Sequence, residues 1–169
     1  MPAPDPCIVR ALDRTSADER ELIARRMRLT LQEVLGEEEG AALYSMEWLR
    51  ERLRWHLEDP SVTAEVYLAL DAEHQSILGH TIVRLESDED GQAFGLFSTT
   101  YVDPAARRRG VARSLVQQGE RWFQKQGMMV FATDTSATNP RLIRLFEGFG
   151  YAIVLRSGDM VRLRKERPA

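Results

Sequence analysis

The apolar residues of this chain repeat with a helical period before Pro60 and with a strand period after it. Apolar residues recur every three or four positions from Ala17 to about Leu35 and from about Ala41 to Glu58. The next three apolar segments are rich in β-branched and aromatic residues and are separated by polar turns, at 64–70, 77–85 and 92–102. Two helices followed by three consecutive strands predict an antiparallel meander packed on helices.

The second half of the chain alternates between the two periods. The spacing predicts a helix over 108–126, a strand over 128–133, a helix opening at Asn139-Pro140, and strands at 151–155 and 160–163. With a short strand at 7–12, the predicted order is β, α, α, β, β, β, α, β, α, β, β. This order specifies an α+β domain with a mixed, mostly antiparallel central sheet flanked by helices.

Length and charge narrow the class of protein. A chain of 169 residues with 43% hydrophobic residues fits one domain over 1–169, with 1–6 as a flexible leader and 164–169 as a charged tail. The formal net charge of −3 gives no overall basic field, so nucleic acid is not an expected partner.

The composition also suggests a compartment. Cys7 is the only cysteine, so the chain forms no internal disulfide and no cysteine-based metal site, which fits a reducing environment. The first residues lack a secretory pattern, and no window reaches the run of about 18 apolar residues that spans a bilayer. We therefore expect a cytoplasmic protein with no membrane partner.

The run Tyr101-Val-Asp-Pro-Ala-Ala-Arg-Arg-Arg-Gly-Val-Ala-Arg-Ser-Leu115 joins a predicted strand to a predicted helix. The first N–H groups of a helix lack internal acceptors and lie at the positive end of its dipole, so this junction suits a diphosphate. Gly110 and Ala112 would let phosphate oxygens approach the backbone. Four arginines add positive charge, which opposes the helix dipole unless an anion is present: Arg107, Arg108, Arg109 and Arg113. The alternative is a solvated basic turn.

Two segments carry a family resemblance. Arg107-Arg-Arg-Gly-Val-Ala112 resembles the Arg/Gln-x-x-Gly-x-Gly/Ala signature of the GNAT superfamily of N-acetyltransferases. Asn139-Pro-Arg-Leu-Ile-Arg-Leu-Phe-Glu-Gly-Phe-Gly-Tyr151 is similar to that family's second cofactor segment, Asn-x-x-Ala-x-x-Leu-Tyr-Glu-x-x-Gly-Phe. The motif-level similarity covers about Thr100 to Tyr151, and two motifs in order are more specific than one.

The resemblance implies an acetyl-CoA cosubstrate held between two splayed strands. The backbone at Thr100 and Val102 would pair with the pantetheine arm, and the diphosphate would lie over Arg108 to Ser114. Asn139 would contact the pantetheine region, and Phe146 would lie near the cofactor sulfur. The implied cofactor-binding residues are Thr100, Val102, Arg107, Arg108, Arg109, Gly110, Val111, Ala112, Arg113, Ser114, Asn139 and Phe146.

The resemblance fails at the acid and the base. Phe146 stands where many relatives carry a tyrosine that acts as general acid. The strand that leads into the junction at 101–115, which we call the cradle, has no glutamate. Tyr101, Ser98 and Thr99 are the nearby polar candidates for catalysis, and none is singled out. Strand alternation puts Ser98 and Thr100 on one face and Thr99 and Tyr101 on the other.

The implied activity is acetyl transfer to a primary amine of a small molecule or peptide. One alternative is a catalytically silent coenzyme A-binding regulator, and a more remote one is a nucleotide-binding module that reads the same diphosphate. Homodimerisation through an exposed strand stays open. No His, Cys or carboxylate spacing indicates a metal, and neither His56 nor His74 has a suitable partner.

Four other features have two interpretations each. Glu37-Glu-Glu39 could attract a cationic amine or be a solvated loop, and His80 could relay protons or simply pack in the core. Trp48 and Trp55 share a helix face and could line an acceptor pocket, although we favour core packing. Asp134 could face the cofactor cleft or be a turn residue.

Overall fold

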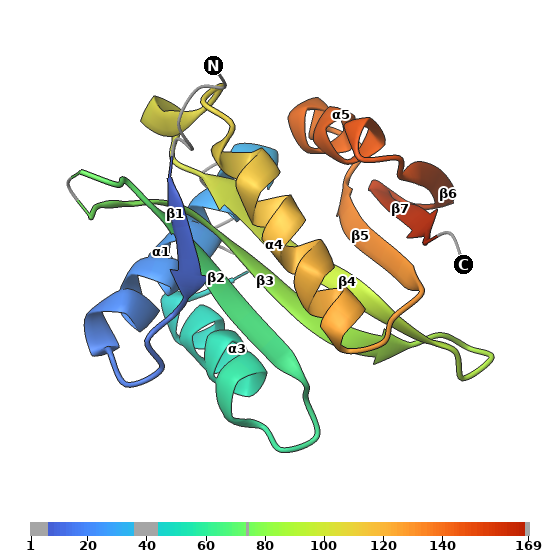
Figure 1. Ribbon diagram of the computed structural model, residues 1–169, viewed down its shortest axis with the longest axis horizontal. Coiled ribbons are helices and arrows are strands. Elements are labelled where there is room, and N and C mark those ends of the chain that lie inside the picture. Colours follow the sequence, from blue (N-terminus) through green and yellow to red (C-terminus); the bar gives the residue numbers. More distant parts are fainter. Residues whose placement is uncertain (1–6, 36–43, 74, 168–169) are drawn as a thin grey trace.

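The computed structural model describes residues 7–35, 44–73 and 75–167, which form a seven-stranded sheet with helices on both faces (Figure 1). The elements in chain order are β1 (Ile8–Ala11), α1 (Ala17–Leu35), α3 (Met46–Glu58), β2 (Ala64–Leu70), β3 (Ile77–Ser87), β4 (Ala93–Val102), the 3₁₀ turn η1 (Pro104–Ala106), α4 (Val111–Lys125), β5 (Val130–Ser136), α5 (Pro140–Gly148), β6 (Ala152–Ser157) and β7 (Met160–Glu166). The order and type of the strands and α-helices match the sequence prediction, which did not include η1.

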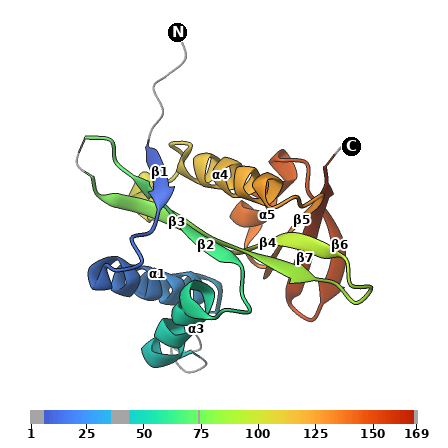
Figure 2. The same ribbon diagram turned by 60° about the horizontal axis from the view of Figure 1, so that its bottom comes forward.

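The strands lie in the order β1-β2-β3-β4-β5-β7-β6. Among the strands of the described residues, β4 and β5 pair in parallel, and the other neighbours are antiparallel. Helices α1 and α3 cover one face of the sheet, whereas α4 and α5 lie on the other (Figure 2). The prediction of a mixed, mostly antiparallel sheet flanked by helices is therefore confirmed.

The parallel join between β4 and β5 is short. Residues 95–97 of β4 pair with 131–133 of β5, and the Thr133 hydroxyl donates to the Phe97 carbonyl at 3.1 Å. Beyond this point β4 stays with β3 as far as Val102, and β5 stays with β7 as far as Ser136. The two strands therefore splay apart, as the family resemblance implied.

Each face of the sheet has its own core. On the α1 and α3 face, the helical period buries residues that include Ile23, Leu49, Leu53, Leu68 and Ile82. On the α4 and α5 face, the largest buried side chains are phenylalanines: Phe97, Phe123, Phe131 and Phe146. Burial of these apolar surfaces is the main term that holds the helices to the sheet.

Two glycines let α4 approach the sheet closely. A Cβ atom on Gly119 of α4 would lie 2.2 Å from the Phe97 ring, and one on Gly95 of β4 would lie 2.3 Å from the Phe123 ring. The two rings meet edge to face, with centroids 5.0 Å apart. Each ring thus occupies the space that a side chain on the opposite element would need.

Two predicted helices begin too early in the sequence. The Ser45 hydroxyl accepts a hydrogen bond from the Trp48 amide, so α3 begins at Met46; residues 41–43 lie outside the described part. The prediction places the start of α4 at Arg108, whereas α4 begins at Val111. Arg108 and Gly110 have φ angles of 65° and 80°, which a right-handed helix excludes.

The C-terminal strands are longer than predicted. β5 continues to Ser136 because it pairs with β7, and β7 continues to Glu166 opposite Val130. Arg164 to Glu166 therefore belong to the sheet and not to the predicted charged tail. The predicted leader at 1–6 and the last residues, 168–169, lie outside the described part. None of the described helices is long and apolar enough to cross a membrane.

Candidate active site

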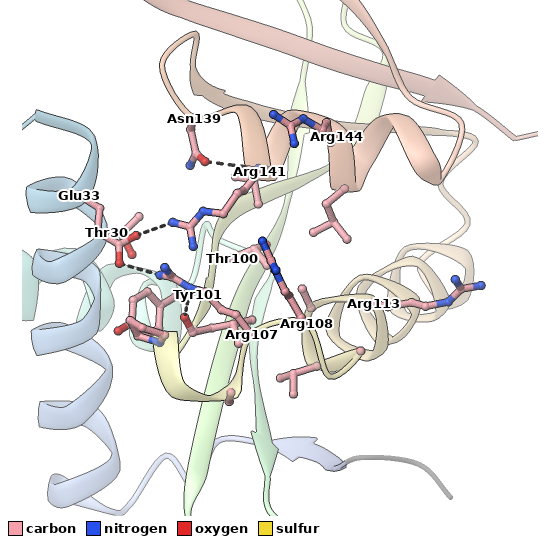
Figure 3. A pocket seen from close by; sticks show the side chains of 18 residues that line it. Thr30, Glu33, Thr100, Tyr101, Arg107, Arg108, Arg113, Asn139, Arg141 and Arg144 are labelled. Carbon is pink, nitrogen blue, oxygen red and sulfur yellow. Dashed lines mark hydrogen bonds and ion pairs between the residues drawn. The ribbon is translucent and has the colours of Figure 1, made fainter. Parts of the chain in front are cut away.

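A cavity of about 700 Å³ lies at the gap between β4 and β5. Its walls come from α1, the end of β4, the loop before α4, the first turn of α4, and α5 (Figure 3). The lining residues are Thr30, Glu33, Thr100, Tyr101, Val102, Pro104, Ala106, Arg107, Arg108, Gly110, Val111, Ala112, Arg113, Asn139, Arg141, Leu142, Arg144 and Leu145.

The N-terminus of α4 borders this cavity without a capping side chain. Gly110 is the N-cap residue in the left-handed conformation, and the first intrahelical bond runs from the Ser114 amide to the Gly110 carbonyl at 3.1 Å. The amides of residues 111–113 therefore lack helical acceptors. Free amides at the positive end of a helix dipole, after a loop with positive φ at Arg108, form a binding site for an anion such as a phosphate.

The cavity wall carries excess positive charge. Five arginines and one glutamate line it: Arg107, Arg108, Arg113, Arg141, Arg144 and Glu33. Glu33 of α1 binds Arg107 at 2.6 Å and Arg141 of α5 at 3.1 Å, so it links both sides of the gap (Figure 3). Arg107 also donates from Nε to the Val102 carbonyl at 3.0 Å.

The four arginines predicted in the cradle have different surroundings. Arg107 is paired with Glu33, and Arg109 does not line the cavity and lies 3.9 Å from Asp71. Arg108 and Arg113 make no ion pair within the described part of the chain. The predicted conflict with the helix dipole is therefore smaller than the sequence suggested, because two of the charges are matched by carboxylates and three arginines precede the helix.

The residues expected along a pantetheine arm do line the cavity. Thr100 and Val102 come from the part of β4 that has left β5, and the Thr100 hydroxyl lies 2.9 Å from that of Thr81. The Asn139 side chain caps α5 by accepting from the Leu142 amide at 3.3 Å. A polar strand edge and a helix N-terminus thus face each other across the gap.

Phe146 and Ser114 do not line the cavity, contrary to the implied binding set. Phe146 has no exposed surface, and its ring centroid lies 5.2 Å from that of Phe97 and 5.0 Å from that of Tyr151. A phenyl ring has no polar atom to keep near solvent, so complete burial against two aromatic rings stabilises this position.

A β-bulge at Ser98 changes which residues of β4 share a face of the sheet. Ile82 pairs with Thr99 and Val83 with Phe97, which leaves Ser98 as an extra residue. The Ser98 hydroxyl accepts from Arg84 on the α3 face of the sheet, whereas Thr100 lines the cavity. The predicted pairing of Ser98 with Thr100 on one face is therefore wrong, because a bulge shifts the alternation.

Of the three candidates, only Tyr101 lines the cavity. Its ring stacks on His80 with centroids 5.9 Å apart, and the Arg26 guanidinium lies 5.7 Å from its centroid. Burial, followed by the nearby Asp103 carboxylate, raises the pKa of Tyr101, so the phenol stays protonated at neutral pH. His80 is fully buried, and burial lowers its pKa to about 3, which supports a packing role over a proton relay.

The remaining sequence candidates lie away from this cavity. Asp134 is part of β5 and forms a two-pronged ion pair with Arg162 at 2.7 and 2.8 Å. Trp48 is 46% exposed, so the favoured core interpretation is wrong for it, whereas Trp55 is half-buried. Glu37–Glu39 and His74 lie outside the described residues. In the part that the structure describes, no group of three His, Cys, Asp or Glu side chains is placed to hold a metal ion.

Sequence reasoning missed the contributions of α1 and most of those of α5. Thr30 and Glu33 lie about 70 residues before the cradle in the sequence, and no local pattern connects them with it. Arg141 and Arg144 carry a weak signal, because a spacing of three residues after the Asn139 cap puts them on one face of a short helix.

The sequence matches the acetyltransferase (GNAT) family over residues 28–151. This range is more than half of the chain, so the protein belongs to that family, whose cosubstrate is acetyl-CoA. The chain is also 49% identical over 39 residues to an aminoglycoside N(6′)-acetyltransferase type 1 from Klebsiella aerogenes. That match spans 23% of this chain and 26% of the relative.

Solved structures confirm the fold over nearly the whole chain. The PaiA N-acetyltransferase from Thermoplasma acidophilum, in complex with coenzyme A, superimposes with a TM-score of 0.73 at 13% identity over 95% of this chain and 98% of that one. The spermidine N-acetyltransferase from Vibrio cholerae, in complex with CoA and spermine, gives 0.67 at 17% identity over 97% of each chain. At these identities the likeness shows the fold alone.

Proposed function

We propose that this protein is an N-acetyltransferase that moves an acetyl group from acetyl-CoA to the primary amine of a small molecule or peptide. One observation carries the proposal: the uncapped N-terminus of α4 borders an arginine-lined cavity of about 700 Å³ at the gap in the sheet. A diphosphate needs such donors and charges, and an extended amide-containing arm needs an unpaired strand edge.

The lining residues divide into two groups by the chemistry they offer. The amides of residues 111–113, with Arg108 and Arg113, would hold the diphosphate. The β4 backbone at Thr100 and Val102, with Asn139 opposite, would hold the pantetheine arm. Arg109, Ser114 and Phe146 are left out of this assignment, because they do not line the cavity. One continuous sheet supports the further proposal that residues 1–169 act as a single domain.

Acetyl-CoA supplies an activated acetyl thioester. The amine nitrogen bonds to the acetyl carbon as the carbon–sulfur bond breaks, the extra amine proton passes to water, and the departing sulfur needs a proton. Tyr101 is the candidate donor, because it lines the cavity and its raised pKa keeps the phenol protonated. The same raised pKa excludes Tyr101 as the base at neutral pH.

A catalytically silent coenzyme A-binding regulator is the second candidate. It is favoured by Phe146, which stands at the position where many relatives carry an acidic tyrosine and which lies wholly within the core. Binding does not separate the two functions, because both use the same cavity. Turnover does.

The test combines calorimetric titration with acetyl-CoA and a thiol-release assay on the same preparation, using a panel of primary amines. We expect binding and amine-dependent release of free thiol. Binding without release from any amine would establish the regulator. Absence of binding would refute both functions.

A further inference from the structure

A hydrogen-bonded chain runs from α3 to the point where β4 and β5 separate. The His56 Nδ1–H donates to the Arg52 carbonyl at 3.0 Å, because a carbonyl can only accept. Its Nε2 is then an acceptor, and Arg84 Nη1 donates to it at 2.9 Å and to the Ser98 hydroxyl at 3.0 Å. His56 is 2% exposed, so this chain anchors the Arg84 guanidinium from the protein interior.

Arg84 is held on its other sides as well. Its Nε donates to Glu86 at 2.5 Å, and its guanidinium lies 5.4 Å from the Trp55 ring centroid. The side chain is 13% exposed, and its Nη2 makes no hydrogen bond to any residue that the structure describes. Two N–H donors on a fixed, partly desolvated guanidinium are therefore left for another molecule.

The location of this group matches the path that an amine acceptor needs. Ser98 directly follows Phe97, the last residue of β4 that pairs with β5. The cofactor cavity is lined by α1, the end of β4, α4 and α5, whereas Arg84 and His56 do not line it and lie beside α3 on the sheet face that α1 and α3 cover. An acceptor that reached the gap from the α3 side of the sheet would pass Arg84.

A second arginine lies beside the first. The Arg52 guanidinium lies over the Trp55 ring, 4.1 Å from the ring centroid, and makes no ion pair in the described part of the chain. Glu86 pairs with Arg84, whereas Arg52 has no paired carboxylate among the described residues, so one positive charge of the two arginines is unmatched. A polycationic acceptor would meet like charge here, and a carboxylate would be attracted.

The geometry points to an acceptor that carries a carboxylate near its primary amine, as an amino acid or short peptide does, with Arg84 and Arg52 binding the carboxylate. This inference rests on the proposed acetyltransferase function and names its substrate class. Two arginines presented on an indole face suit a planar carboxylate better than an ammonium group.

Three acceptors with the same glycyl amine and different far ends provide the test: glycylglycine, glycylglycine amide and a glycinamide whose far end is a trimethylammonium group, which cannot be acetylated. We expect kcat/KM for glycylglycine to exceed that for the amide by about tenfold or more, since a charge-assisted pair is lost. The dicationic acceptor should be the poorest of the three. A preference for the amide or the dication overturns the inference.

Two variants locate the preference. Arg84→Lys keeps the positive charge but loses the paired N–H donors of the guanidinium. Arg52→Gln removes the charge and keeps the backbone carbonyl that accepts from His56. Each variant should lower the ratio of kcat/KM for glycylglycine to kcat/KM for the amide at least threefold. Arg54 pairs with Glu51 on the solvent side of α3, so the control variant Arg54→Gln should not change this ratio. An unchanged ratio in both variants, with melting temperatures close to wild type, overturns the assignment. Coenzyme A binding without turnover of any of the three acceptors overturns the acceptor class, and lack of coenzyme A binding overturns the proposed function itself.

Discussion

Gly110 and Gly127 have nearly the same backbone conformation at opposite ends of α4. Their φ angles are 80° and 79°, a region that residues with a side chain rarely adopt. Gly110 lines the cavity, whereas a Cβ atom on Gly127 would meet nothing within 4 Å. The pair separates backbone strain from damage to the site.

We expect Gly110→Glu to weaken acetyl-CoA binding by at least about tenfold, because bulk and negative charge enter the anion site. Gly127→Glu carries the same backbone strain and serves as the control, with affinity close to wild type. Calorimetric titration measures both. Equal affinities in folded Gly110→Glu and wild type would remove the proposed diphosphate site.

Tyr101→Phe tests the proton donor. Since the ring and its stacking on His80 are kept, we expect acetyl-CoA affinity to change less than threefold while kcat falls about tenfold or more. Steady-state thiol release at saturating acceptor gives the comparison. An unchanged kcat would show that the departing sulfur takes its proton from elsewhere.

At this scale, prediction succeeded where the signal was local. The run from Thr100 to Arg113 supplied most of the cofactor-facing wall, because consecutive residues of one strand, loop and helix end border one cavity. Glu33 could not be predicted, since its contact with Arg107 joins residues 74 positions apart. The position of Ser98 was mispredicted because one inserted residue reverses strand alternation and leaves no mark in composition.

Among the elements, α4 is the one most closely fitted to the sheet. Gly119 is the least favourable residue for a helix interior apart from proline, yet it lies in the middle of α4 where the Phe97 ring needs its space. Packing therefore outweighs helix propensity at this position. At a second point the roles are reversed, because Gly95 of β4 leaves space for the Phe123 ring of α4.

Gly119→Ala sets these two effects against each other. The added methyl favours the helix by about 1 kcal/mol but would lie 2.2 Å from the Phe97 ring, which puts the cost of the clash in the upper part of the usual range, at about 2–3 kcal/mol. We expect a net loss of stability of about 1–2 kcal/mol in urea denaturation. The double variant with Phe97→Leu should lose less than the sum of the two single changes. A more stable Gly119→Ala protein would contradict the packing argument.

Element type could be predicted throughout the described chain because the apolar period is strong in each segment. Element ends could not, because they depend on single interactions. The hydroxyl of Ser45 sets the start of α3, and the positive φ angles at Arg108 and Gly110 delay α4. The partner strand sets the end of β7 at Glu166, which no feature of its own residues indicates.

For the whole molecule, two buried histidines make stability depend on pH. Burial lowers the pKa of His56 from 6.5 to about 4 and that of His80 from 6.5 to about 3. Between pH 4 and 6.5 both rings are neutral in the folded protein and protonated in the unfolded chain. Unfolding therefore takes up protons in this window, and stability falls as the pH is lowered through it.

We expect the free energy of unfolding to be about 2–3 kcal/mol lower at pH 5.5 than at pH 7.5, with about half of the drop from each histidine. Urea denaturation at the two pH values measures it. His80→Leu fills a similar volume without a titrating group and should remove about half of the difference. Equal stability of the wild type at both pH values would contradict the low pKa values.

The sheet consists of two well-paired parts, β1–β4 and β5–β7, which are joined by the short parallel pairing of β4 with β5. Three residue pairs join β4 to β5, whereas nine join β3 to β4 and seven join β5 to β7. A ligand arm with amide groups, bound in the gap, would extend this junction by supplying the hydrogen bonds that β4 and β5 do not make with each other. Cosubstrate binding would then stabilise the β4–β5 junction, where the sheet has the fewest residue pairs. The fraction of protein that resists unfolding and proteolysis would rise with the concentration of the compound that the reaction consumes.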